Sequence, residues 1–261
     1  MRLDEVIRGP VRPRAHPTSL RVAVLRHEPE TGLGALAPLL GDAGVEYEIF
    51  ETTGPAPLPD AIDFDAAIAL GGSLGAYDPA LLETRRWIRD AVLGDLPLLG
   101  ICLGGQLLAS ALGGEVESGL RPEVGVHDVF FTDAARHDPL FAGLPRRLQV
   151  FGWHEDTFSL PRRAIPLAGS MAYANQAFRW GATAYGLQFH VEVRPGDLQR
   201  WKHLPGYARL FEAAGARGDV LDAALEAATP MLDETMRTLV ERWLLLVTGA
   251  AAVRGRQRIP A

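Results

Sequence analysis

This 261-residue sequence has only one cysteine, no excess of basic over acidic residues and no long apolar run. Its single cysteine, Cys102, excludes a disulfide framework and suits a reducing compartment. A net charge of −6 argues against a general nucleic-acid binder, which would carry a basic face. No apolar run is long enough for a transmembrane span, because Glu241 and Arg242 interrupt the most apolar C-terminal stretch. The first residues lack the continuous apolar core of a signal peptide. These absences predict a cytoplasmic protein with no nucleic-acid and no membrane partner.

Four short apolar runs, at residues 21–27, 45–52, 65–72 and 97–102, predict buried strands. Helical patterns are expected at about 33–40, from an N-cap at Asp78, and directly after Cys102. This rhythm predicts an α/β fold, with an open, mainly parallel twisted sheet and helices on both faces. Ligands bind such sheets beyond the carboxyl ends of the strands, so His27, Gly71-Gly72 and Cys102 are expected to meet at one edge.

The pattern changes twice in the second half of the chain. After Gly114, short strand-like runs without long helices predict a largely antiparallel meander that extends the sheet. From Pro195 onward the period becomes helical. The expected organisation is a flexible N-terminal arm at 1–20, a catalytic domain at 21–195, and a C-terminal helical extension at 196–261 packed on that domain.

The run Pro97–Gly114 carries the clearest chemical signal. A strand leads into Cys102 and a helix follows at once, within the pattern Gly100-Ile101-Cys102-Leu103-Gly104. This is the arrangement of a nucleophile elbow, whose sharp turn leaves no room for a Cβ on either side of the nucleophile. The positive end of the helix favours a thiolate at Cys102. A buried free cysteine is the alternative, and the spacing favours the nucleophile.

A cysteine nucleophile needs a base, and His190 is the strongest of seven histidines. In the run GLQFHVEV, His190 and Glu192 are two residues apart, so a strand would place both on one face. The carboxylate would then orient the imidazole and stabilise its cation, as in a triad. An ordinary strand with alternating polar residues is the other interpretation of this pattern.

An acyl-transfer site also needs N–H donors for an oxyanion. The amide of Leu103 and the Gly71-Gly72 corner are the candidates, although the glycine pair also fits a plain tight turn. His154, in the phrase Trp153-His154-Glu155-Asp156, is expected to be a satisfied polar group on a loop. No spacing of acidic residues and histidines predicts a metal site.

The runs GGSLGAYD, PLLGICLGGQLLA and YGLQFHVEV, in this order, resemble the class I (triad-type) glutamine amidotransferase family, especially its stand-alone members similar to GMP synthase. The phrases FGWHEDTFSLP and NQAFRW strengthen the resemblance, which covers about 21–193. It implies the flavodoxin-like fold of that family, with no cofactor. It also implies Cys102 as nucleophile, His190 as base and acid, and Glu192 as its partner. Gly72 and Leu103 then match the oxyanion positions, while Gly71 and Gln106 match positions that hold the substrate.

By this resemblance, Cys102 attacks the side-chain carboxamide of glutamine or of a γ-glutamyl amide or peptide, and ammonia or an amine leaves. The chain has no phosphate-binding loop of the form G-x-x-x-x-G-K-[ST], nor a pyrophosphatase-type loop. The sequence therefore leaves open whether it supplies ammonia to a separate synthase or acts as a self-sufficient hydrolase. The identity of the small-molecule substrate and the oligomeric state, monomer or homodimer, also stay open.

Two other functions remain from the residues alone. A cysteine hydrolase or redox protein similar to the DJ-1/PfpI group shares the strand-cysteine-helix elbow but not the late His190/Glu192 pair. A non-catalytic binding protein on the same fold is the third, and the full set of triad residues argues against it.

Overall fold

A single nine-stranded sheet runs through residues 19–257, the part of the chain that the computed structural model describes. Most of the expected N-terminal arm lies outside the described residues. The strands are β1 (Arg21–Arg26), β2 (Glu46–Glu51), β3 (Ala66–Ala69), β4 (Leu98–Ile101), β5 (Val116–Phe131), β6 (Arg147–Phe158), β7 (Ile165–Ser170), β8 (Ala177–Trp180) and β9 (Ala184–Leu187). Their order in the sheet is β2-β1-β3-β4-β9-β8-β7-β5-β6. The first five are mutually parallel, whereas β8, β7, β5 and β6 continue the sheet with antiparallel pairings.

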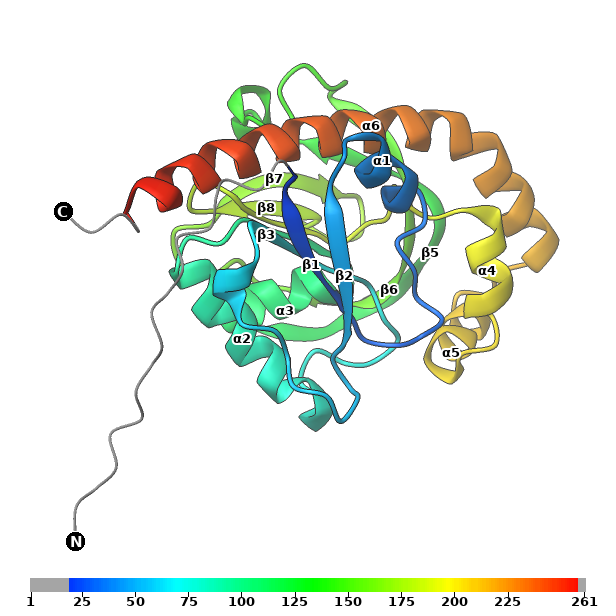
Figure 1. Cartoon of the computed structure of the whole chain (residues 1–261). Coiled ribbons are helices and arrows are strands. Elements are labelled where there is room, and N and C mark those ends of the chain that lie inside the picture. The colour runs from blue at the N-terminus through cyan, green and yellow to red at the C-terminus, as the bar shows by residue number, and fades with distance from the viewer. Residues whose placement is uncertain (1–18, 258–261) are drawn as a thin grey trace, which may run out of the picture.

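Helices cover both faces of this sheet, as the sequence predicts (Figure 1). They are α1 (Leu36–Asp42), α2 (Leu82–Leu93), α3 (Leu103–Ala111), α4 (Pro195–Trp201), α5 (Pro205–Ala213) and α6 (Gly218–Gln257), with short 3₁₀ turns at Ala61–Asp63, Pro79–Leu81 and Ala134–His137. Helices α2 and α3 lie on one face, α1 and α6 lie on the other, and α4 and α5 stand beside β5 (Figure 1). Alternate residues of β1 show the two layers, because Val22 and Val24 pack with one apolar cluster while Ala23 and Leu25 pack with the other.

The N-terminal half follows the predicted elements closely. The side chain of Asp78 accepts a hydrogen bond from the Ala80 amide, so it caps the turn that leads into α2, as expected. The first helix differs from its expected range of 33–40 and begins at Leu36. The backbone before it is held in a turn, with Gly34 at φ +49° and the Ala35 amide donating to the carbonyl of Glu192 at 2.8 Å. A long-range contact therefore sets where α1 begins.

The expected strand around His190 is wrong. Strand β9 ends at Leu187, and beyond it only a single bridge between His190 and Phe151 of β6 has strand character. The chain turns here into the C-terminal helices, so the alternation in GLQFHVEV reflects buried contacts on both sides of an irregular segment. The antiparallel character expected after Gly114 is confirmed by the pairings of β5, β6, β7, β8 and β9.

The C-terminal extension ends in a single helix of 40 residues. Pro230 lies inside α6, where it removes one backbone donor and crowds the preceding turn. Such a residue bends a helix, and Figure 1 shows α6 curving around the domain toward α1. Its apolar side chains, including Leu232, Met236 and Trp243, belong to the same core cluster as β1 and α1. The extension and the sheet therefore share one core.

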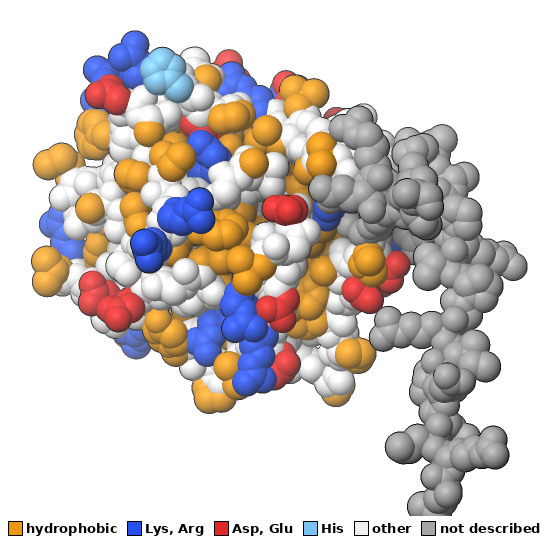
Figure 2. All heavy atoms as spheres, turned by 90° about the vertical axis from the view of Figure 1, so that its left-hand side faces the viewer, with side chains coloured by type: hydrophobic (Ala, Val, Ile, Leu, Met, Phe, Trp, Pro, Cys, Tyr) orange, Lys and Arg blue, Asp and Glu red, His pale blue; other side chains and the backbone are white. Residues whose placement is uncertain are grey.

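Across the described residues, no helix combines the length and apolar character needed to cross a membrane. On the face drawn in Figure 2, basic and acidic side chains stand in small separate groups around apolar ones. Neither sign of charge forms a continuous field on that face.

Candidate active site

Cys102 lies at the turn between β4 and α3, and its backbone is strained. It has φ 50° and ψ −109°, in the region that side chains other than glycine rarely adopt. A Cβ at Gly100 would lie 2.5 Å from the carbonyl oxygen of Gly104, and a Cβ at Gly104 would lie 2.0 Å from that of Ala69. Both glycines are thus required by close backbone contacts, Gly100 across the turn and Gly104 against the neighbouring strand β3. The sequence expectation of a sharp elbow fits this geometry.

His190 and Glu192 lie next to each other, although they do not share a regular strand. Nδ1 of His190 is 2.6 Å from Oε1 of Glu192, and the other carboxylate oxygen accepts a hydrogen bond from the Val191 amide. Both side chains are buried, with His190 0 % exposed. Burial alone would lower the pKa of His190, but the charges of Glu192 and Cys102 raise it to about 10. The imidazole is therefore held as a cation at neutral pH.

Gly71 brings this pair and the cysteine together. An ideal Cβ at Gly71 would lie 3.0 Å from Cε1 of His190 and 3.5 Å from Cβ of Cys102, so both residues adjoin the glycine corner. Nε2 of His190 has no hydrogen-bond partner among the described residues, although the charge of Cys102 acts on the ring. Hydrogen bonds between a catalytic base and a nucleophile are often long until substrate binds.

Gly72 and Leu103 lie side by side next to Cys102. A Cβ at Gly72 would come within 2.9 Å of Cδ2 of Leu103. Among the described residues, no group accepts a hydrogen bond from the amide of Gly72 or of Leu103, whereas the neighbouring amides of Cys102 and Gly104 donate to Leu187 and Leu70. Unpaired backbone N–H groups are the kind of donor that an oxyanion site needs.

Gln106 and Gln188 connect the elbow to strand β6. The Gln106 side chain, on the first turn of α3, donates to Oε1 of Gln188 at 3.1 Å and to the carbonyl of Asp156 at 3.3 Å. The amide of Gln188 in turn lies 3.7 Å from the sulfur of Cys102 and donates to it. Gln188 is absent from the residues predicted from the sequence. The spacing of two that pairs His190 with Glu192 also separates Gln188 from His190, and this signal could have found it.

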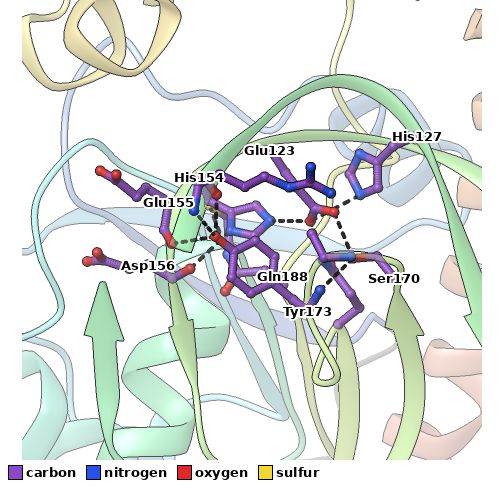
Figure 3. Close-up of polar contacts among 12 residues, drawn as sticks. Glu123, His127, His154, Glu155, Asp156, Ser170, Tyr173 and Gln188 are labelled. Carbon is purple, nitrogen blue, oxygen red and sulfur yellow. Dashed lines mark hydrogen bonds and ion pairs between the residues drawn. The ribbon is translucent and has the colours of Figure 1, made fainter. Parts of the chain in front are cut away.

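His154 lies in β6 and not on a loop, so that expectation is wrong. It is opposite Glu123 of β5 in the strand pairing, which fixes the contact between their side chains. Its Nδ1 is 3.0 Å from the carbonyl of Asp156, and its Nε2 is 3.1 Å from Glu123 (Figure 3). His154 is satisfied on both sides, as expected. Burial opposes ionisation of Glu123, but His154 and His127 lower its pKa below the ordinary value, so it is a carboxylate.

The same carboxylate also contacts the end of β7 and the residue before β8. Ser170 at the end of β7 donates to Oε1 of Glu123 at 2.7 Å (Figure 3). Gln176 donates to Oε2 of Glu123 at 2.5 Å. Since His154 shares the Asp156 carbonyl with Gln106, one chain of polar contacts runs from Glu123 to the side chains beside Cys102. This cluster fixes the wall of the site formed by β5 and β6.

Aromatic residues from the C-terminal extension cover His190. The ring of Trp201, at the end of α4, lies 5.2 Å from the imidazole, and Tyr207 of α5 stacks on Trp201 at 5.1 Å. Trp153 of β6 meets both rings edge to face. Sequence reasoning missed this cover because nothing in the helical pattern from Pro195 onward indicates which residues turn toward the cysteine.

His27 also reaches this end of the sheet, as expected, but it lies behind Gly72. An ideal Cβ on Gly72 would lie 3.3 Å from the Cβ of His27, and Nδ1 of His27 is 2.7 Å from the hydroxyl of Thr52. Burial lowers the pKa of His27 to about 4, so it is neutral and packs as part of the core. Within the described residues, no group of three or more histidine, cysteine or acidic side chains could hold a metal ion.

Comparison with known proteins gives these features a context. Residues 34–201 match the family described as "Glutamine amidotransferase class-I". A glutamine amidotransferase-like protein of Salmonella typhimurium, YfeJ, is 31% identical over 66% of this chain and 76% of its own length. A glutamine-hydrolyzing GMP synthase of Thermus thermophilus is 35% identical over 72% of this chain, which spans only 35% of that relative. One subunit of the glutamine-hydrolyzing GMP synthase of Archaeoglobus fulgidus is 34% identical over 59% of this chain and 79% of its own length.

A solved structure agrees with these sequence relatives. The crystal structure of a glutamine amidotransferase from Thermotoga maritima superposes with a TM-score of 0.77 at 32% identity. The match covers 86% of this chain and 97% of the Thermotoga chain. The likeness therefore extends beyond the central strands to most of the fold.

Proposed function

The chain belongs to the class I glutamine amidotransferase family, and from this premise we propose that it hydrolyses the side-chain carboxamide of glutamine, or of a γ-glutamyl amide, through a thioester on Cys102. The observation that carries the proposal is the buried contact of 2.6 Å between His190 and Glu192 beside a cysteine on a strained elbow. A carboxylate in that position keeps the imidazole protonated and oriented.

The reaction begins with His190 as a cation and Cys102 as the thiolate. The sulfur attacks the carboxamide carbon, and the electron pair of the C=O bond moves to oxygen. The free amides of Gly72 and Leu103 donate to that oxyanion. Collapse of the intermediate breaks the C–N bond, and His190 gives its proton to the departing nitrogen, so ammonia or an amine leaves and a γ-glutamyl thioester remains.

Hydrolysis of the thioester uses the same groups in reverse. The now neutral His190 removes a proton from water, whose oxygen attacks the thioester carbon. The second intermediate collapses with expulsion of the Cys102 thiolate, and the free carboxylic acid leaves. Glu192 stabilises the imidazolium that forms in both steps. We assign Gln106 and Gly71 to substrate contact because they match the positions that hold the substrate in the family; Gly71 adjoins Cys102, and Gln106 bonds Gln188, which donates to the sulfur.

A separate synthase as recipient of the ammonia is the second part of the proposal. The support is that the Archaeoglobus relative is named as one subunit of GMP synthase and that this chain spans about a third of the Thermus GMP synthase it matches. The self-sufficient hydrolase of γ-glutamyl amides uses the same chemistry without a partner.

The experiment is a substrate panel of glutamine, γ-glutamyl dipeptides and γ-glutamyl amines, with ammonia or amine release measured for the wild type and Cys102→Ala. We expect release from at least one substrate by the wild type and a loss of at least about 10³-fold in the variant. Equal rates in both proteins would exclude Cys102 as the nucleophile. Stimulation of glutamine turnover by an added synthase would support the partnered form, and turnover of γ-glutamyl amines without one would support the hydrolase.

A further inference from the structure

Tyr207 carries a buried hydroxyl that nothing in the reaction above uses. The residue is 1% exposed, and its oxygen has no hydrogen-bond partner among the described residues. An unpaired buried hydroxyl costs about 1–3 kcal/mol, whereas a phenylalanine of the same shape would not. The hydroxyl thus has hydrogen-bonding capacity that the described residues leave unused.

The location of this hydroxyl is the catalytic corner. It lies 3.8 Å from the position of an ideal Cβ on Gly71, the same point that is 3.0 Å from Cε1 of His190 and 3.5 Å from Cβ of Cys102. Three groups, from the turn after β4, from the segment after β9 and from α5, therefore surround one small space. Gly71 also supplies the peptide whose N–H belongs to Gly72, so the hydroxyl adjoins the residue before one of the two amides assigned above to the oxyanion.

The ring of Tyr207 is fixed on every side. It stacks on Trp201 with an interplanar angle of 11° and meets Trp153 edge to face, while the indole N–H of Trp153 donates to its backbone carbonyl at 3.2 Å. The preceding residue, Gly206, is pressed against Ser73, because a Cβ there would lie 2.7 Å from that of Ser73. The start of α5 is thereby held against the loop that follows Gly72. A side chain held in this way meets the requirement for a preorganised donor.

Burial raises the pKa of Tyr207 well above its ordinary value, and the nearby negative charges of Cys102, Glu28 and Glu192 raise it further. The hydroxyl keeps its proton at any pH at which the protein works, so it can donate and will not compete as a base.

We propose that Tyr207 is a catalytic residue supplied by the C-terminal extension, whose hydroxyl donates a third hydrogen bond to the oxygen of the tetrahedral intermediate on Cys102. The proposal rests on the carboxamide chemistry above, and it makes α5 a part of the active site. The extension then has a chemical role in addition to its packing on the sheet.

The first test compares Tyr207→Phe with the wild type in glutamine turnover. Loss of one oxyanion donor costs on the order of 100-fold in kcat, while KM changes little, because the bond forms in the transition state. The variant should melt at the same or a higher temperature, because the unpaired hydroxyl is gone. Tyr185→Phe is the matched control: its buried hydroxyl bonds Asp138 at 3.1 Å, so this variant should lose stability and keep kcat.

A second test needs no turnover. An aldehyde such as butyraldehyde adds to Cys102 as a hemithioacetal: the C–S bond forms, the C=O π bond breaks, and the new oxygen takes the proton that His190 holds. This adduct places an oxygen where the intermediate has one, and its affinity is measured as protection of Cys102 from iodoacetamide. We expect at least tenfold weaker protection in Tyr207→Phe, with an unchanged rate of alkylation when no aldehyde is present.

The two tests separate the proposals. The wild type could release no ammonia or amine from any carboxamide and still bind the aldehyde more tightly than Tyr207→Phe does. In that case the substrate assignment fails and the role of Tyr207 holds. Equal aldehyde affinity in both proteins, or a kcat of Tyr207→Phe within twofold of the wild type, overturns the role of Tyr207.

Discussion

At Cys102 the sharp turn that presents the sulfur stores backbone strain of about 1–3 kcal/mol. The surroundings hold it there, since the Cys102 amide donates to Leu187 at 2.7 Å and the next turn of α3 is locked against β3. The same surroundings place His190 and Gln188 beside the sulfur from the neighbouring strand end. The position of each reactive side chain thus depends on two neighbouring strands of the sheet.

Glu192 gives the first prediction at this scale. Its charge is the main cause that raises the pKa of His190, against burial, so Glu192→Gln should move the alkaline limb of kcat/KM from near pH 10 to lower pH. We also expect kcat to fall by on the order of 10³- to 10⁴-fold, as when the carboxylate of a triad is made neutral. A pH–rate profile of wild type and variant measures both. The control is Glu155→Gln, and an alkaline limb that stays in place in Glu192→Gln contradicts the assignment.

Single residues also show how far sequence reasoning reaches. Cys102, its flanking glycines and the pair His190/Glu192 are recognisable because the residues of each set lie within a few positions of one another along the chain. Gln188 follows the same local rule. Tyr207 and Trp201 reach His190 through the packing of helices that are far away in sequence, and no local pattern encodes that packing. Short spacing along the chain therefore indicates these residues and could have indicated Gln188, whereas the two aromatic residues that arrive through helix packing were missed.

At the scale of the element, the contact between α3 and β3 decides whether the elbow forms. Gly104, in the first turn of α3, approaches the backbone of Ala69 so closely that a side chain cannot fit. The expectation of a clash at this turn holds, but the clashing atom belongs to the neighbouring strand. Close approach of helix and strand also brings the side chain of Leu103 against Gly72, since a Cβ at Gly72 would lie 2.9 Å from Cδ2 of Leu103.

Gly104→Ala should therefore be strongly destabilising, by about 3 kcal/mol or more, because a Cβ would lie 2.0 Å from the carbonyl oxygen of Ala69. Gly249→Ala is the matched control within α6, where a Cβ meets nothing within 4 Å. That change should stabilise the protein by about 0.5–1 kcal/mol, since alanine restricts the unfolded chain. Urea unfolding of both variants gives the two values, and a small loss in Gly104→Ala would show that α3 can shift away from β3.

At the scale of the whole molecule, a parallel half built on β1–β4 and β9 is joined to an antiparallel half of β8, β7, β5 and β6. The parallel half and the change of character after Gly114 were predictable, because runs of apolar residues and helical periods alternate in the first part only. The end of β9 at Leu187 and the continuity of α6 through Pro230 were not predictable. The alternation after Leu187 indicates a longer strand and the proline indicates a break in the helix, but burial in the common core outweighs both. The C-terminal extension shares the core of the sheet and adjoins the active site, so substitutions in its buried residues should alter both stability and activity.

His190 and His27, the two histidines with the largest pKa shifts, together predict that the free energy of unfolding is highest near pH 6.5. His190 has a pKa raised to about 10, so the stability that it contributes is fully present below pH 6.5 and is lost as the pH rises toward 10. His27 has a pKa lowered to about 4 by burial, so its contribution is present above pH 6.5 and is lost as the pH falls toward 4.

The acid side is the cleaner test, because His27 is fully buried and its side-chain partner is the neutral hydroxyl of Thr52. A depression of this size corresponds to roughly 3 kcal/mol of unfolding free energy, lost between pH 6.5 and 4. In His27→Gln, whose side chain does not titrate, urea unfolding at pH 7, 5.5 and 4 should show a decline smaller than that of the wild type by about this amount. The control is His137→Gln, on the exposed turn before Asp138, and it should decline as the wild type does. A His27→Gln protein that loses stability in acid as steeply as the wild type would show that His27 can accept a proton without leaving the core.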